Sequence, residues 1–178
     1  MPTASGPRPL PLTRRTCMAL LLAALSFRLR GARADEPLKS DRILVLKADR
    51  VLLLLKDGKV QKAYPIALGP RPRGAKRRRG DGRTPEGFYF IDRRSARTPF
   101  HRELHISYPN AEDRERARAA RVNPGGAIFI HGMPASFGHH DPVRFFVDWT
   151  DGCIAVGNIA IEEIWNSVAD GTVIEIRP

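Results

Sequence analysis

From residue 42 onward the chain consists of short apolar segments separated by turn residues. Residues 50–56 and 59–68 flank Asp57-Gly58, a strong signal for a two-residue hairpin, because both central positions of a type I′ turn require a positive φ. Further strands are expected at residues 42–48, 88–92, 104–107, 127–131, 153–156 and 172–176. Many short strands of this kind predict a mostly β domain of the α+β class.

Two short helices are expected between these strands. Asn110 is placed to cap residues 110–121, whose first turn is acidic and whose last turn is basic, as the helix dipole favours. Asn158 is placed to cap a second helix at residues 159–169. A long loop rich in Gly, Pro and Arg spans residues 69–87.

The composition excludes several classes of protein. The chain has 178 residues, of which 42% are hydrophobic and 28% charged, and this is too apolar for a disordered chain. No uncharged run reaches the roughly 20 residues that a membrane span needs, so a polytopic membrane protein is excluded. The length fits one domain with an appendage.

The first 34 residues have the pattern of an export signal. Arg14-Arg15 precede the apolar run 17–27, and Ala32-Arg33-Ala34 provides an A-x-A cleavage site. The paired arginines permit a twin-arginine signal as well as a Sec signal. Arg28 and Arg30 follow the apolar run, which leaves an uncleaved anchor as the alternative. We expect an exported protein with no membrane span after cleavage.

Cleavage changes the charge and the cysteine count. The removed segment carries six arginines, so the mature chain keeps 24 basic and 19 acidic groups and its net charge falls from +11 to about +5. Cys17 is also removed, which leaves Cys153 alone. A single cysteine in an oxidising compartment either pairs between molecules or is a reactive thiol.

His131 and Cys153 are the candidate catalytic pair. His131 ends an apolar segment and is followed by Gly132, and Cys153 follows Gly152. A thiol with a pKa near 8.5 is only about 3% thiolate at pH 7. An imidazole that takes the thiol proton therefore increases the thiolate fraction greatly. The Gly132 carbonyl can orient that imidazole, and the N–H groups of Gly152 and Cys153 can form an oxyanion hole. The alternatives are a buried apolar cysteine and a structural histidine.

Five segments of this chain resemble one enzyme family. Ile130-His131-Gly132 and Thr150-Asp151-Gly152-Cys153-Ile154-Ala155-Val156 are similar to the active-site signature of L,D-transpeptidases with the YkuD-type catalytic domain. Residues 80–87, the hairpin at 51–68 and the tail at 161–176 resemble that family too. The resemblance covers nearly all of the mature chain.

The resemblance implies a β-sandwich of mixed sheets with two short helices, in a catalytic domain at residues 42–178 after a linker at 35–41. It implies that Cys153 attacks the carbonyl of an L-centre in a peptidoglycan stem peptide, becomes acylated and passes the acyl group to an amine or to water. His131 would then be the base, Gly132 its orienting carbonyl and Gly152 an oxyanion donor. No cofactor and no metal are implied, and the expected location is the periplasm or cell envelope.

Two positions depart from the family pattern. Many members have His before the Gly-Cys pair and Arg or Asn two residues after the cysteine, where this chain has Asp151 and Ala155. These differences resemble a branch that includes an amidase releasing a wall-bound lipoprotein, so the acceptor stays open: water, a stem-peptide amine or a lipoprotein lysine. Thr150, Asp151, Arg83 and Arg144 are the candidate substrate-binding residues.

The basic run at residues 71–83 offers a function of another class. Seven basic residues lie there against Asp81, and such a run attracts anionic wall polymers or substrate carboxylates. A non-catalytic wall-binding module is therefore an alternative. Nucleic-acid binding is not expected, because the run lacks adjoining aromatic residues and the chain is expected to be exported.

Two clusters of histidine complete the candidates. His139, His140 and Asp141 invite a zinc site together with His131, but adjacent histidines point in different directions and no H-E-x-x-H motif is present. His101, Glu103 and His105 alternate with apolar residues, which predicts the exposed face of a strand.

Overall fold

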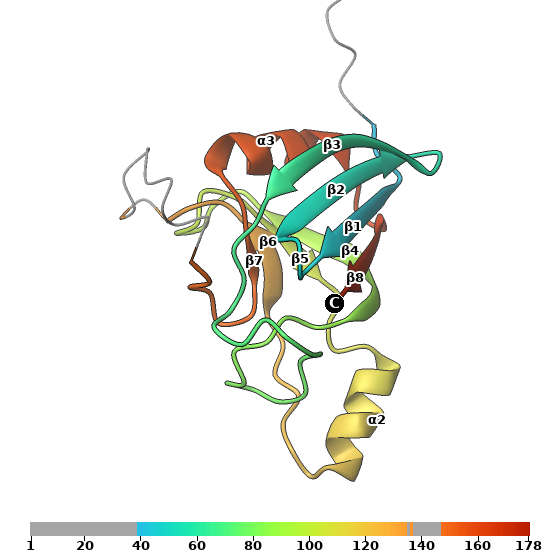
Figure 1. Cartoon of the computed structure of the whole chain (residues 1–178), viewed down its shortest axis with the longest axis vertical. Helices are drawn as coiled ribbons and strands as arrows, with labels where there is room; N and C mark the ends of the chain where they lie inside the picture. The colour runs from blue at the N-terminus through green and yellow to red at the C-terminus, as the bar shows by residue number, and fades with distance from the viewer. Residues whose placement is uncertain (1–38, 135, 137–146) are drawn as a thin grey trace, which may run out of the picture. The chain divides into compact units, whose positions relative to one another are not determined.

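The structure is a computed structural model that describes residues 39–134, 136 and 147–178. In this part of the chain eight strands form one mixed sheet in the order β3-β2-β1-β8-β4-β5-β6-β7 (Figure 1). The β1–β8 and β6–β7 pairs are parallel and the others are antiparallel. The strands are β1 (Arg42–Leu46), β2 (Val51–Lys56), β3 (Lys59–Pro65), β4 (Gly87–Ser95), β5 (Glu103–Ile106), β6 (Ile128–His131), β7 (Ile154–Ala155) and β8 (Val173–Arg177).

The β2–β3 hairpin is confirmed. Asp57 and Gly58 form its turn with φ of 50° and 73°, the positive values that the dipeptide predicts. The backbone N–H of Asp57 donates to the side chain of Asp41 at 2.9 Å. This contact ties the hairpin turn to the residue that precedes β1.

The sheet curls until its two ends meet. Ala67, two residues beyond β3, forms an antiparallel bridge with Ala155 in β7, with both N–H···O distances at 2.9 Å. β4 belongs to both halves of the curled sheet. It pairs with β8 over residues 87–90 and with β5 from Ile91 onward. The sequence predicts only five residues for this strand. The observed strand is longer, because a register shift after Ile91 lets it continue in its pairing with β5.

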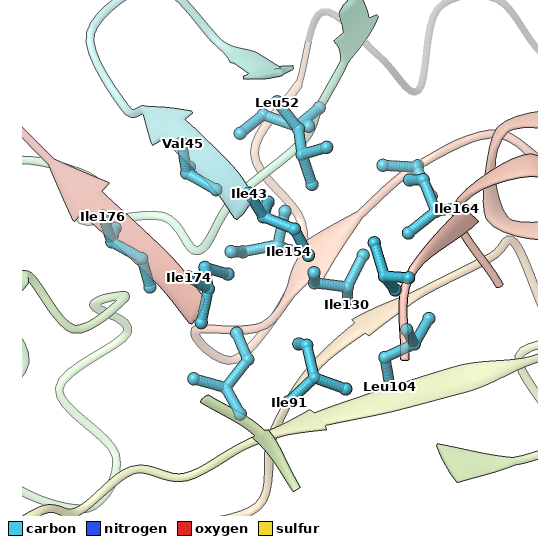
Figure 2. Close-up of a cluster of buried hydrophobic side chains, with 14 of the residues drawn as sticks. Ile43, Val45, Leu52, Ile91, Leu104, Ile130, Ile154, Ile164, Ile174 and Ile176 are labelled. Carbon is cyan, nitrogen blue, oxygen red and sulfur yellow. The ribbon is translucent and has the colours of Figure 1, made fainter. Parts of the chain in front are cut away.

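The concave side of the curled sheet holds the core. Figure 2 shows Ile43, Ile130, Ile154 and Ile174 pointing toward one another from four strands, and each is fully buried. Ile164 closes the cluster from helix α3 (Asn158–Ser167). Burying each such side chain contributes roughly 1.5–3 kcal/mol, so this cluster is the main stabilising element of the domain.

Helix α2 (Ala111–Ala119) begins as the sequence predicts. Asn110 accepts a hydrogen bond from the backbone N–H of Asp113, and the Asp113 side chain accepts one from the N–H of Asn110, which is a complete capping box. Asp113 also accepts a hydrogen bond from Tyr89 at 3.0 Å, and this bond attaches the helix to β4.

The expected cap of α3 is wrong. Gly157 is the N-cap, in extended conformation, and Asn158 is the first helical residue. The side chain of Asn158 accepts a hydrogen bond from the backbone N–H of Met133 at 2.8 Å instead of one from its own helix. The side chain of Asn158 thus has a partner that is distant in sequence, Met133, instead of a partner in its own helix.

The mostly β fold with two short helices is confirmed in the described part of the chain. None of the helices described there is long and apolar enough to cross a membrane. The predicted export signal at residues 1–34 lies outside the described residues.

Candidate active site

His131 is the last residue of β6 and is buried. Its Nδ1 lies 2.7 Å from the carbonyl oxygen of Gly132. A carbonyl oxygen only accepts, so Nδ1 carries the hydrogen and donates it. The second ring nitrogen, Nε2, is then unprotonated in the neutral imidazole and can accept a proton.

The surroundings of His131 favour this neutral form. Burial lowers the pKa of the imidazole, while the hydrogen bond to Gly132 and the negative charge of Glu103 partly oppose that change. The rings of Phe100 and Trp149 pack on the imidazole at centroid distances of 4.6 Å and 5.7 Å. The imidazole of His131 is therefore uncharged at neutral pH, and packing on two sides sets its orientation.

Cys153 lies directly before β7, which runs parallel to β6. Ile154 is opposite Ile130 and Ala155 is opposite His131. Side chains two residues apart in a strand share one face. If the register is extended by one residue to Cys153, its side chain falls on the face of β6 that carries His131, offset from it by two residues.

The thiol of Cys153 is partly exposed and free of any disulfide. Its Sγ lies 3.6 Å from the carbonyl oxygen of Ala127, to which the thiol donates. Burial raises the pKa of the thiol to about 11; a backbone hydrogen bond from Phe129 and the charge of Lys76 lower it, while Glu103 and Asp151 raise it further. Only about one thiol in 10⁴ would ionise unaided at pH 7. A nucleophilic role thus requires a base beside it.

The turn before Cys153 is stabilised by the side chain of Thr150. The Thr150 hydroxyl accepts from the N–H of Gly152 at 3.2 Å and donates to the carbonyl of Cys153 at 2.8 Å. The backbone N–H of Thr150 in turn donates to Leu68 at 2.9 Å. Thr150 is buried, and its hydroxyl shapes the turn that presents the thiol.

A cavity of about 420 Å³ opens beside Cys153. Most of its lining comes from two glycine-containing segments, residues 70–82 and 125–128. The backbone N–H of Arg79 in the first donates to the carbonyl of Asn123, just before the second, at 2.8 Å. The basic lining residues are Arg71, Lys76 and Arg79, and the acidic one is Asp151.

Only part of this positive charge is available to a ligand. Lys76 is buried and forms an ion pair with Asp81 at 2.9 Å. Arg71 and Arg79 line the cavity and are exposed; Arg71 also donates from its guanidinium to the carbonyl of Asp81 at 3.3 Å. Such a site favours an anionic ligand.

The structure separates the four predicted substrate-binding residues. Asp151 is exposed and lines the cavity, whereas Thr150 is buried in the turn. The Arg83 guanidinium lies beside Gly74, away from the cavity lining, and only its backbone reaches the catalytic turn. Arg144, like His139, His140 and Asp141, lies outside the described residues.

Position 155 carries only a methyl group. Ala155 is fully buried and its backbone bridges Ala67. It offers no charged partner, whereas Arg71 and Arg79 line the cavity. The sequence marks both only as members of a basic run; their position on the cavity depends on how the loop folds.

The expectation for residues 101–105 is wrong for two of its three members. Glu103 and His105 are half-buried, and they lie opposite His131 and Phe129 in the β5–β6 ladder. The alternation is present, but β5 is an interior strand, so its polar face is the one that carries His131. His101 alone is exposed, paired with Glu162.

The comparisons with known proteins identify the family of this chain. The family model for the YkuD L,D-transpeptidase catalytic domain matches residues 40–176. YafK of Escherichia coli (strain K12) is 30% identical over 137 residues, which cover 74% of this chain and 48% of that protein. The chain thus spans about half the length of the curated relatives it matches.

Solved structures give the same result. The helical cell shape determining protein Pgp2 of Campylobacter jejuni, as the K307A mutant, is similar with a TM-score of 0.59 and 27% identity over 79% of this chain and 47% of that chain. The L,D-transpeptidase of Xylanimonas cellulosilytica has the same fold, with a TM-score of 0.51 and 17% identity over 89% of this chain and 69% of that chain. This chain therefore belongs to the YkuD family of L,D-transpeptidase catalytic domains.

Proposed function

We propose that this protein is an exported cysteine acyltransferase that acts on peptidoglycan stem peptides in the periplasm or cell envelope. The observation that supports the proposal is the parallel β6–β7 pairing, because it joins the strand that ends in His131 to the strand that begins directly after Cys153. Family membership supplies the substrate class, and the cavity beside Cys153 supplies the space for it.

In the first half-reaction the Sγ–H proton of Cys153 moves to Nε2 of His131. The thiolate attacks the carbonyl carbon of the scissile amide, and the carbonyl oxygen becomes an oxyanion. The Cys153 N–H stabilises that oxyanion, joined by Gly152 N–H when it leaves the Thr150 hydroxyl at 3.2 Å. The C–N bond then breaks, and the departing amine takes the proton from His131, leaving a thioester on Cys153.

In the second half-reaction an acceptor attacks the thioester. His131 removes a proton from the acceptor, the new acyl bond forms, and the C–S bond breaks with the proton returning to sulfur. An amine of a second stem gives a cross-link, a lipoprotein amine gives attachment, and water gives hydrolysis. The reverse of attachment, with water as acceptor, would release a wall-bound lipoprotein.

Arg71 and Arg79 are proposed to hold a carboxylate of the stem peptide at the cavity. Both are arginines with exposed guanidinium groups, which suit a carboxylate better than a lysine does. They take the place of the family side chain that is absent at position 155.

The test uses a carbapenem and purified muropeptides. A thiolate opens the strained β-lactam, so the wild-type protein should gain the mass of one carbapenem, and Cys153→Ala should gain none. When the full chain with its signal segment is used, Cys17→Ala is the matched control and should behave as wild type does. Mass spectrometry of the muropeptides identifies the acceptor: a released terminal residue alone indicates water, and a cross-linked product indicates an amine.

Retention of muropeptide turnover by Cys153→Ala would refute the acyltransferase. Wall binding that persists in Cys153→Ala, weakens with salt and involves no bond cleavage by the wild type would instead identify the basic wall-binding module.

A further inference from the structure

Glu103 faces His131 across the β5–β6 ladder. The two are directly opposite in the antiparallel register. Gly132 N–H donates to the carbonyl of Arg102 at 3.2 Å, so the hydrogen bonds flank the Glu103–His131 pair rather than join it. In such a non-hydrogen-bonded pair the Cα atoms are about 4.5 Å apart and the side chains are at their closest.

The carboxylate is held by the segment that also covers the imidazole. Thr98 donates its hydroxyl hydrogen to Glu103 at 2.6 Å, and the same hydroxyl accepts the backbone N–H of Phe100 at 3.0 Å. The Phe100 ring packs on His131 at 4.6 Å. One short chain segment therefore places a negative charge and an apolar ring beside the same base.

We propose that Glu103 is a positioning residue of the catalytic pair, whose negative charge stabilises the imidazolium that His131 forms on taking the thiol proton. The proposal rests on the proposed function of the pair. An imidazolium in a buried site loses much of its hydration, so a carboxylate at the neighbouring position compensates for part of that cost. The carboxylate itself touches neither substrate nor sulfur and acts through His131.

The charges around the pair distinguish Glu103 from its neighbours. In the described part of the chain, Glu103 acts on both groups and raises both pKa values, whereas Asp151 and Lys76 act on the thiol of Cys153. Among the described residues, the uncharged Phe100, Trp149 and Gly132 also contact the imidazole. His105 lies two residues after Glu103 on the same face of β5. It is paired with Asp92 and packs on Phe129.

Glu103 acts on both groups of the pair and Asp151 acts on the thiol, and this difference can be tested directly with a control. Glu103→Gln keeps an oxygen for the Thr98 hydroxyl and removes only the charge. The rate of Cys153 alkylation by iodoacetamide, measured against pH on the full protein, should show two inflections, one for each group of the pair. In Glu103→Gln both should move to lower pH, by roughly one unit each.

Asp151→Asn is the matched control, because its charge acts on the thiol and not on the imidazole. It should move only the thiol inflection to lower pH. Unchanged melting temperatures for both variants would exclude a general loss of structure as the cause.

An alkylation profile of Glu103→Gln that superimposes on the wild-type profile would overturn the inference. So would a profile in which only the thiol inflection moves, as in Asp151→Asn. Failure of the proposed function looks different: the wild-type protein itself would then form no carbapenem adduct and process no muropeptide, whatever its alkylation profile.

Discussion

The carbonyl oxygen of Arg83 occupies the space that a side chain on Gly152 would need. A Cβ atom at position 152 would lie 2.4 Å from that oxygen, and Gly152 has a φ of +118°. The backbone of the loop at residues 69–87, which also lines the cavity, is thus packed directly on the turn that presents Cys153. The position of the thiol and the shape of the cavity depend on one backbone contact.

Gly152→Ala should therefore be severely destabilising. The positive φ and the clash with backbone act together, and we expect a loss of roughly 3 kcal/mol or more in the free energy of unfolding, with loss of carbapenem acylation. Gly171→Ala is the control: its φ is +88°, but its Cβ would meet nothing within 4 Å, so about 1–2 kcal/mol is expected. Urea denaturation measures both. Equal losses for the two variants would contradict the role of the Arg83 contact.

Asn158 should control the orientation of His131 through the backbone. Its side chain accepts the N–H of Met133 at 2.8 Å, beside the Gly132 carbonyl that holds the imidazole. Asn158→Ala should lower kcat about tenfold with little change in KM, because the base is less well oriented. Asn158→Asp keeps an acceptor oxygen and should retain most of the activity. Steady-state kinetics on a stem peptide separates the two variants, and equal rates would argue against this role.

Asp81 should make the protein sensitive to acid. Burial raises the pKa of its carboxyl, but the N–H groups of Arg77, Arg78 and Arg83 and the ammonium of Lys76 outweigh this, so the pKa falls to about 2. Because the folded-state pKa lies below the unfolded value, this stabilisation is complete above about pH 4 and is lost as the pH falls toward 2.

The contribution of the Asp81 shift is about 2 kcal/mol. Asp81→Asn should be less stable at pH 7, and it should lose less stability than wild type between pH 4 and pH 2. The exposed Asp49→Asn is the control and should follow the wild-type curve. Chemical denaturation at a series of pH values tests this, and parallel curves for wild type and Asp81→Asn would refute it.

Arg71 and Arg79 should determine substrate affinity rather than the chemical step. Each exposed charge is worth up to about 1 kcal/mol, so Arg71→Gln and Arg79→Gln should each raise KM roughly two- to fivefold at unchanged kcat. The double variant should also lose most of the salt dependence of KM. Arg114→Gln, on the exposed side of α2, is the control of equal charge. A double variant with wild-type KM would place the anionic subsite elsewhere.

The local elements could be predicted because their signals are local. Asp57-Gly58 requires a hairpin through its own backbone preference, and Asn110 with Asp113 closes a capping box within four residues. The pairing of His131 with Gly132 is also local, since the histidine bonds to the carbonyl of the next residue.

Where the sequence misled, a distant partner competed with the local one. Asn158 bonds to Met133 instead of capping its helix. Glu103 alternates as a surface residue would, yet its strand lies between two others and its polar face is the one that carries His131. Arg83 belongs to the basic run, but its guanidinium turns toward Gly74.

The amino-acid sequence by itself determined the strand segments, the cap of α2 and the choice of Cys153 and His131 as candidates, because these depend on neighbours along the chain. The tertiary structure decided what those side chains face. Strand order, the β6–β7 register and the meeting of Ala67 with Ala155 join residues far apart in sequence. Those contacts follow from burying one shared core, whose packing no single segment specifies.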